Sequence, residues 1–128
     1  MAFIQNVTLD ILKGKTTSTV SVSFTACFTS CELKAGFYFS DCVDLFGADP
    51  GPDQYLLPMG RINCYQPKER CITRSYKRTV KNSILDEDPK WLGIFNRRDE
   101  VYARACIKPV VPRGECRNSP IEFDYFEV

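Results

Sequence analysis

Apolar and polar residues alternate along most of this chain, with the period of two expected of β-strands that bury one face. The clearest run lies at residues 20–28, where Val20, Val22, Phe24, Ala26 and Phe28 are separated by Ser, Thr and Cys. Branched and aromatic side chains on one face favour a half-buried strand. Cys27 falls on the polar face, so we expect its partner on a covering loop or a neighbouring strand.

Seven further segments predict strands, and the longer ones among them show the same alternation. They cover residues 7–13, 35–46, 55–57, 61–65, 71–80, 101–107 and 121–125. We expect Pro58 and Gly60 to separate the two short strands, and Pro109 to end the strand that begins at residue 101. The residues GADPGPD at 47–53 predict a loop.

Asp41 interrupts an otherwise apolar face in the segment 35–46. That face consists of Phe37, Phe39, Val43 and Leu45. A carboxylate at this position predicts a β-bulge or an exposed strand end.

Residues 82–98 are the least regular stretch, with room for one helical turn that packs Trp91, Leu92 and Phe95 inward. About eight strands with frequent turn signals indicate an all-β fold in one domain, residues 1–128. We therefore predict a two-layer antiparallel β-sandwich of immunoglobulin-like or related Greek-key architecture, stabilised by disulfides. Its layers resemble those of immunoglobulin domains, but the Tyr-x-Cys signature and the core Trp near the first Cys are absent. Tyr102 lies four residues before Cys106, and the single Trp is Trp91.

The chain contains seven cysteines, an odd number: Cys27, Cys31, Cys42, Cys64, Cys71, Cys106 and Cys116. This frequency in a small domain predicts a secreted, extracellular protein with up to three disulfides. The spare cysteine is then free or joins two chains, and the spacing leaves the connectivity open. The alternative is a cytosolic protein with reduced thiols. We expect a leader peptide to have preceded Met1, and Asn6 begins the one glycosylation sequon.

The chain has no histidine, which excludes Ser-His-Asp and Cys-His catalytic groups. Carboxylates remain as possible acid–base residues, namely Asp41, Asp44, Asp86 and Glu87. No spacing marks two of them as a catalytic pair. We therefore expect a protein that is not an enzyme.

Acidic side chains gather near the loop 47–53 and predict one possible metal site. They are Asp41, Asp44, Asp49 and Asp53, with a second group at residues 86–88. Hard oxygen ligands on loops suit calcium. The alternative is that these are solvated turn residues, so we expect no cofactor unless calcium binds here.

Residues 68–81, which we call the basic strand, carry six cationic side chains against one acidic one. The candidate binding residues are Arg70, Arg74, Tyr76, Lys77, Arg78 and Lys81. Alternation places Arg74, Tyr76 and Arg78 on one face and Lys77 on the other, which favours an edge strand or a strand with little cover. The charge either protects that edge, pairs with the acidic residues 115–128, or contacts an acidic partner.

These observations favour a secreted recognition module that binds another macromolecule without catalysis. The partner would be a protein, an acidic glycan or an anionic surface, contacted by residues 47–53, 82–90 or the basic strand. The net charge of +1 argues against nucleic acid. No apolar run is long enough to span a membrane. A homodimer through the odd cysteine or the strand edges is possible. The alternatives are a calcium-dependent adhesion or membrane-binding β-sandwich and a carrier of small hydrophobic ligands.

Overall fold

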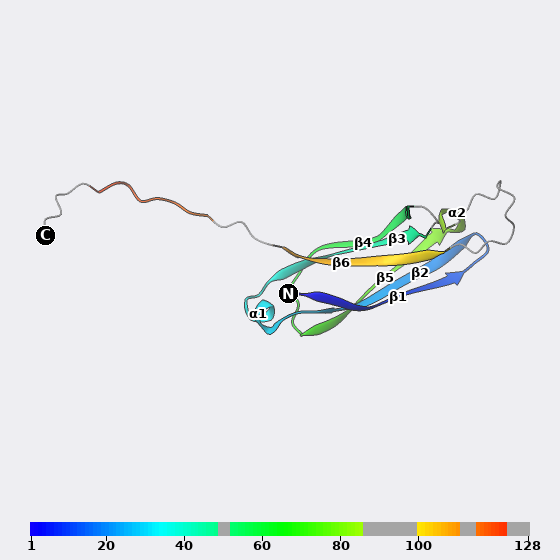
Figure 1. Ribbon diagram of the computed structural model, residues 1–128, viewed down its shortest axis with the longest axis horizontal. Coiled ribbons are helices and arrows are strands. Elements are labelled where there is room, and N and C mark those ends of the chain that lie inside the picture. The colour runs from blue at the N-terminus through cyan, green and yellow to red at the C-terminus, as the bar shows by residue number, and fades with distance from the viewer. Residues whose placement is uncertain (49–51, 86–99, 111–114, 123–128) are drawn as a thin grey trace.

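The computed structural model describes residues 1–48, 52–85, 100–110 and 115–122 of the chain (Figure 1). These residues form six strands and two short helices. The strands are β1 (Phe3–Lys13), β2 (Thr17–Cys27), β3 (Tyr38–Gly47), β4 (Gln54–Tyr65), β5 (Cys71–Lys81) and β6 (Val101–Val110). The helices are α1 (Ser30–Lys34) and α2 (Asn82–Leu85). The prediction of a mostly β protein is confirmed.

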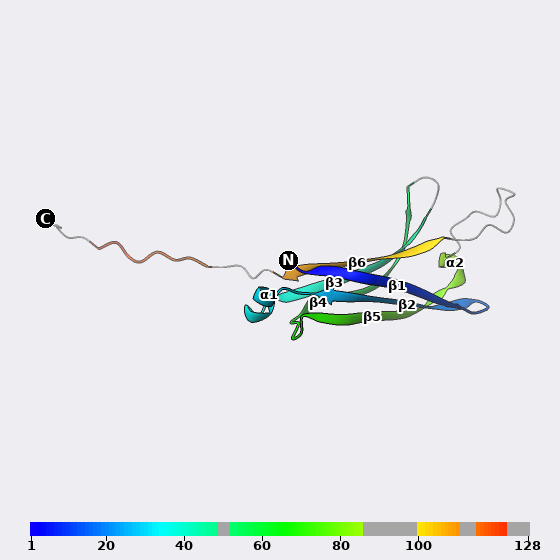
Figure 2. The same cartoon turned by 60° about the horizontal axis from the view of Figure 1, so that its bottom comes forward.

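The strands form two antiparallel sheets of three strands each, in the orders β1-β2-β5 and β4-β3-β6. The sheets lie one over the other in a sandwich-like arrangement (Figure 2). At one edge β1 lies alongside β6, and at the other β5 lies alongside β4. Each sheet therefore has one face toward the other sheet and one outer face.

The core between the sheets comes mainly from the alternating residues of β2 and β3. Val20, Val22, Phe24 and Ala26 of β2 are buried, as are Phe39, Val43 and Leu45 of β3. Full burial of one such large side chain contributes about 1.5–3 kcal/mol to folding. From β6, the predicted inward residues Val101, Ala103, Ala105 and Ile107 pack against this core. The alternation in β2 and β6 is therefore confirmed.

The neighbourhood of Asp41 differs in part from the prediction. The pairing of β3 with β4 shifts register between Phe39 and Asp41, so the predicted bulge is present. The alternative of an exposed strand end is wrong, because Asp41 is buried. Phe37 precedes β3 and is 48% exposed, so it does not share the inward face of Phe39. Residues 35–37, the predicted start of the strand, lie between α1 and β3.

Two predicted strand breaks are wrong. Pro58 and Gly60 lie inside the continuous strand β4, where a register shift between Val43 and Asp44 accommodates the proline. Pro109 lies inside β6, which continues to Val110. Both β4 and β6 are edge strands, and an edge position tolerates the missing amide hydrogen of proline.

The C-terminal segment departs from the prediction where it is described. Residues 115–122 are exposed and belong to no strand, so Ile121 and Glu122 do not begin a strand (Figure 1). Glu115 pairs with Arg117 of the same segment and with no residue of the basic strand. The expected final strand from residue 123 onward, and the predicted packing of Trp91, Leu92 and Phe95, lie outside the described residues.

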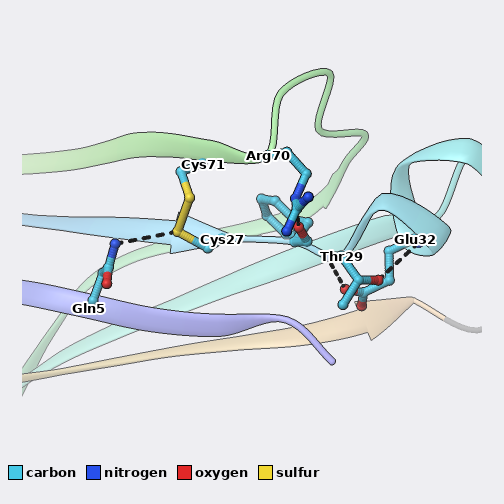
Figure 3. The surroundings of a disulfide bond; sticks show 7 residues. Gln5, Cys27, Thr29, Glu32, Arg70 and Cys71 are labelled. Carbon is cyan, nitrogen blue, oxygen red and sulfur yellow. Dashed lines mark hydrogen bonds between the residues drawn. A yellow bond between two sulfur atoms is a disulfide. The ribbon is translucent and has the colours of Figure 1, made fainter.

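A disulfide joins Cys27 at the end of β2 to Cys71 at the start of β5 (Figure 3). These residues are direct partners in the antiparallel pairing of the two strands. The partner of Cys27 is therefore on a neighbouring strand, one of the two predicted positions. Gln5 of β1 donates a hydrogen bond to the sulfur of Cys27. Among the described helices, neither has the length and apolar character needed to cross a membrane.

Candidate functional site

The basic strand contains β5, which forms one edge of the sheet β1-β2-β5, as the sequence predicts. Arg74 and Tyr76 are half-buried on the face that looks toward the other sheet. Lys77 and Lys81 are exposed at the alternate positions, which belong to the outer face. The strand therefore divides its polar side chains between the interior and the outer face.

The inward side chains of β5 meet the buried carboxylate of Asp41, whose side chain is 0% exposed. Arg74 Nε lies 2.7 Å from Asp41 Oδ2, and the Tyr76 hydroxyl donates to the same oxygen at 2.6 Å. Tyr65 of β4 donates to Asp41 Oδ1 at 2.8 Å. The Arg74 guanidinium also lies 4.0 Å from the centre of the Tyr65 ring. Side chains from β4 and β5 thus converge on one carboxylate of β3. We call Asp41, Tyr65, Arg74 and Tyr76 the Asp41 cluster.

Electrostatics in the Asp41 cluster keep both tyrosines protonated. Burial, followed by the hydrogen bond to Asp41, raises the pKa of Tyr76 to about 12. The same two causes raise the pKa of Tyr65 further. Each phenol remains a hydrogen-bond donor to the carboxylate, because ionisation would place two negative charges side by side.

Two further arginines of the basic strand bind backbone carbonyls. Arg70 Nε donates to the carbonyl of Phe28 at 2.8 Å, close to the disulfide (Figure 3). Arg78 Nη1 donates to the carbonyl of Pro58 in β4 at 2.6 Å. Of the six candidate binding residues, Arg70, Arg74, Tyr76 and Arg78 therefore have intramolecular partners, and Lys77 and Lys81 are the two at exposed outer positions.

The structure separates the predicted calcium ligands. Asp41 lies on the inner face of β3 and Asp44 on its outer face, so these two carboxylates do not meet. Asp44 accepts hydrogen bonds from Arg61 and Tyr55, and Asp53 accepts one from Tyr102. Asp49 and residues 86–88 lie outside the described residues. Within the part of the chain that the structure describes, no three His, Cys, Asp or Glu side chains group as metal ligands.

Three aromatic rings lie in a row across the outer face of the sheet β4-β3-β6. The rings of Tyr55 and Phe46 have centres 5.6 Å apart, and those of Phe46 and Tyr102 are 5.5 Å apart. Arg104 places its guanidinium carbon 4.7 Å from the centre of the Phe46 ring. Arg61 lies beside the row on β4, with 43% of its side chain exposed. We call Phe46, Tyr55, Arg61, Tyr102 and Arg104 the outer aromatic surface.

Hydrogen bonds hold the edges of the outer aromatic surface in place. The Tyr102 hydroxyl donates to Asp53 at 2.6 Å, and this bond raises the pKa of Tyr102. Arg61 Nη2 lies 2.6 Å from Asp44 Oδ1, and the Tyr55 hydroxyl reaches the same oxygen at 3.4 Å. Asp53 belongs to the predicted binding loop 47–53, so the described end of this loop borders the surface.

Sequence reasoning did not select the outer aromatic surface. Phe46 and Tyr102 are direct partners between β3 and β6, and Phe46 and Tyr55 are partners between β3 and β4. The alternation along β6 assigned Tyr102 and Arg104 to the face opposite the core, which is the signal available in the sequence. Nothing in the spacing shows that three such rings from distant segments share one row.

The predicted glycosylation residue and the cysteines lie on several different segments of the structure. Asn6 is exposed in β1, at a register shift where it adopts a positive φ of 58° that asparagine tolerates. Cys31, Cys64 and Cys116 are exposed thiols, whereas Cys42 and Cys106 are partly buried thiols. The Cys27–Cys71 bond is the one disulfide among the described residues.

In comparisons with known proteins, no family model, no curated protein and no solved structure matches this chain.

Proposed function

We propose that this chain is a secreted recognition module, without catalysis, that binds an extracellular protein through the outer aromatic surface. The observation that carries this proposal is the row of three rings flanked by two arginines on an outer sheet face. Tyrosine and arginine are enriched among residues that dominate protein–protein binding energies. A tyrosine ring supplies a large amphipathic contact area at a low cost in conformational entropy.

The geometry of the surface supports binding in a second way. Tyr55 is 50% exposed, so its ring has area left for a partner to cover. Its hydroxyl and that of Tyr102 are already fixed by carboxylates of the same chain. Side chains fixed before binding lose less entropy on association, which favours affinity. Arg104 and Lys108 are exposed cations on the same face and favour an acidic loop of the partner.

The sulfur chemistry supports an extracellular location. Cys27 and Cys71 are bonded in a small β domain, and such bonds persist in oxidising compartments. The exposed sequon at Asn6 is compatible with glycosylation during secretion.

We further propose that the fold is an immunoglobulin-like sandwich. Taking β1 to β6 as strands A, B, C, C′, E and F, the two sheets have the orders A-B-E and C′-C-F. Those are the neighbours that the same strands have in immunoglobulin domains. The disulfide differs, because Cys27–Cys71 joins B to E within one sheet, whereas the immunoglobulin bond joins B to F between sheets.

The test is a comparison of two matched charge reversals. Arg104→Glu changes the outer aromatic surface, and Lys77→Glu makes the same charge change at an exposed mid-strand position on the outer face of the other sheet. Wild-type protein and both variants are immobilised and exposed to the extracellular protein fraction of the source organism. Bound proteins are quantified by mass spectrometry, and their affinities are measured after purification.

We expect one partner protein to bind wild type and Lys77→Glu equally well. The same partner should bind Arg104→Glu at least about tenfold more weakly. Tyr55→Ala should weaken the same partner. Equal retention by wild type and Arg104→Glu, combined with loss in Lys77→Glu, would move the contact to the basic strand. Retention of glycans from an immobilised panel in place of proteins would overturn the protein partner proposed here.

A further inference from the structure

Cys42 and Cys106 lie directly opposite each other on neighbouring antiparallel strands. Cys42 is in β3, Cys106 is in β6, and the two are partners in the register of this pair. Both occupy outer-face positions, since their neighbours Val43 and Ala105 belong to the core and its lining. Two thiols from distant parts of the chain are thus placed side by side on one face.

The spacing of such a pair suits a disulfide. Opposite residues in an antiparallel pair have Cα atoms about 4.5 Å or about 5.5 Å apart, depending on the hydrogen-bonding pattern. Both distances fall within the range of about 4.4–6.8 Å over which disulfides form. The chain already contains this arrangement once, because Cys27 and Cys71 are opposite partners in β2 and β5 and are bonded.

We propose that Cys42 and Cys106 form a second cross-strand disulfide in the oxidised protein. Each sheet would then hold one bond between its central strand and a flanking strand. Cys27–Cys71 joins β2 to β5, and Cys42–Cys106 joins β3 to β6. The proposal does not depend on the proposed function.

The surroundings favour this pairing over the alternatives. On the other side of β3, the partner of Cys42 is Arg61, so Cys64 of β4 does not face it. The Cys42 sulfur is partly buried and contacts the Asp44 carboxylate at 3.5 Å. Cys106 is therefore the cysteine that the strand pairing places opposite Cys42.

The bond forms by two thiol–disulfide exchanges with a small-molecule disulfide such as oxidised glutathione. One cysteine thiolate attacks a glutathione sulfur, which breaks the glutathione disulfide and releases one glutathione thiolate. The second cysteine thiolate then attacks the mixed disulfide on the first cysteine and releases the second glutathione thiolate. Two protein thiols are oxidised to one disulfide, glutathione disulfide is reduced to two glutathione thiols, and the two cysteine protons pass through solvent to the released glutathione thiolates.

The second bond would act next to the outer aromatic surface. Along the outer face of β3 and β6, the pair Cys42–Cys106 is followed by Asp44–Arg104 and then by Phe46–Tyr102. A covalent link two positions from Arg104 fixes the register of the strands that carry the rings. The bond also closes residues 42–106, a longer loop than that closed by Cys27–Cys71, and longer loops lose more unfolded-state entropy.

Disulfide mapping of the full-length protein tests the proposal, because trypsin separates the relevant cysteines. Cleavage after Lys and Arg, except before Pro, leaves Cys42 in peptide 35–61 and Cys106 in peptide 105–113. Cys27 lies in peptide 16–34 together with Cys31, and Cys71 lies in peptide 71–74. Fragment ions that separate residue 27 from residue 31 assign the link to Cys27, and the Cys27–Cys71 bond is then the internal reference. The protein is refolded in a glutathione buffer made more oxidising until the reference peptides are linked. Free thiols are then alkylated, and the digest is analysed without reductant.

We expect peptides 35–61 and 105–113 to be linked in the molecules that contain the reference link. Cys64→Ser is the matched control and should keep this link, whereas Cys42→Ser should leave Cys106 alkylated. Recovery of Cys42 and Cys106 as alkylated thiols in wild-type protein with the reference link overturns the proposal. A link from Cys42 to the peptide of Cys31, Cys64 or Cys116 overturns it equally. Because wild-type protein alone gives the answer, the result does not depend on the folding of a variant.

Discussion

Arg74 of β5 and Asp41 of β3 join the two sheets through an ion pair of 2.7 Å, in which the Asp41 side chain is 0% exposed and that of Arg74 is 20% exposed. Removal of one partner from a buried pair leaves the other charge uncompensated, at a cost of about 3–5 kcal/mol. We expect Asp41→Ala to lower the free energy of unfolding by about 3 kcal/mol. This value is at the lower end of that range, because the Arg74 side chain can reach solvent. Urea unfolding followed by fluorescence measures this change.

The matched control is the double variant Asp41→Leu with Arg74→Met. Replacement of both charges by apolar groups of similar size removes the desolvation penalty together with the attraction, so the double variant should be more stable than Asp41→Ala. Tyr65 and Tyr76 would lose their acceptor in both proteins, so this loss cancels in the comparison. A double variant less stable than Asp41→Ala would contradict a buried-charge origin.

The protein should lose stability in alkali, in part because Tyr76 contributes less to folding as the pH rises. Its pKa rises from the ordinary 10.0 to about 12 in the folded protein, because of burial and of the bond to Asp41. Between these two values the folded state holds a proton that the unfolded state has released. The stability that this shift in the pKa of Tyr76 gives to the folded state is therefore fully present below about pH 10, and it is lost as the pH rises toward about 12.

Urea unfolding at a series of pH values from about 9 to about 12 measures this loss. Tyr76→Phe lacks the ionisable group and should show a shallower fall over the same interval, although Tyr65 continues to contribute. Ultraviolet absorbance of the phenolates gives an independent measurement, because it counts the tyrosines that ionise only at high pH. The Tyr76→Phe variant should contain one such tyrosine fewer than wild type. Equal slopes in the two proteins would show that Tyr76 does not carry this dependence.

Gly60 of β4 should resist enlargement, because the Tyr76 ring packs directly against its α-carbon. A β-carbon at this position would collide with the ring atoms Cδ1 and Cε1 of Tyr76. Relief of the collision moves the ring and strains its hydrogen bond to Asp41. We expect Gly60→Ala to cost about 1–3 kcal/mol of stability, the range usual for overpacking. In a Tyr76→Ala background the same substitution should cost much less, and an equal cost in both backgrounds would contradict the contact.

The sequence predicts the strands that line the core well and the short elements poorly, for a physical reason. In β2 and β6 the alternation continues over many residues, because each strand places one face on the core. The helix α1 has five residues, too few for a helical period to appear. Its signal is local: Thr29 and Glu32 form a capping box, in which each side chain binds the backbone amide of the other (Figure 3). That spacing could have predicted the helix start.

The candidate sites depend on partners that are distant in the sequence. Asp41 suits calcium when only its neighbours in the chain are considered, and Arg74, its actual partner, lies on another sheet. Alternation predicts correctly that Arg74 and Tyr76 share a face of β5. It does not say that this face is the inner one, because buried charges are disfavoured until a partner is known. The outer aromatic surface likewise requires the register of three strands.

Asp44 should slow the chemistry of Cys42 in the fully reduced protein. Burial raises the pKa of this thiol, and the Asp44 carboxylate, which lies 3.5 Å from the sulfur, raises it further. Since the thiolate is the reactive form, Cys42 should react with iodoacetamide more slowly than the exposed Cys31 near pH ~8. Asp44→Asn removes the negative charge, favours the thiolate and should accelerate alkylation of Cys42.

The rate at Cys31 in the same sample is the internal control for that experiment, because fragment ions of peptide 16–34 distinguish Cys31 from Cys27 and peptide 35–61 reports Cys42. Asp44→Asn also loses the ion pair with Arg61, so local opening could expose Cys42 independently of charge. Arg61→Ala distinguishes the two causes. It removes the same ion pair, keeps the carboxylate and takes away a cation that favours the thiolate, so alkylation of Cys42 should become slower still. Acceleration by both substitutions would identify opening of the strand, and not charge, as the determinant of Cys42 reactivity.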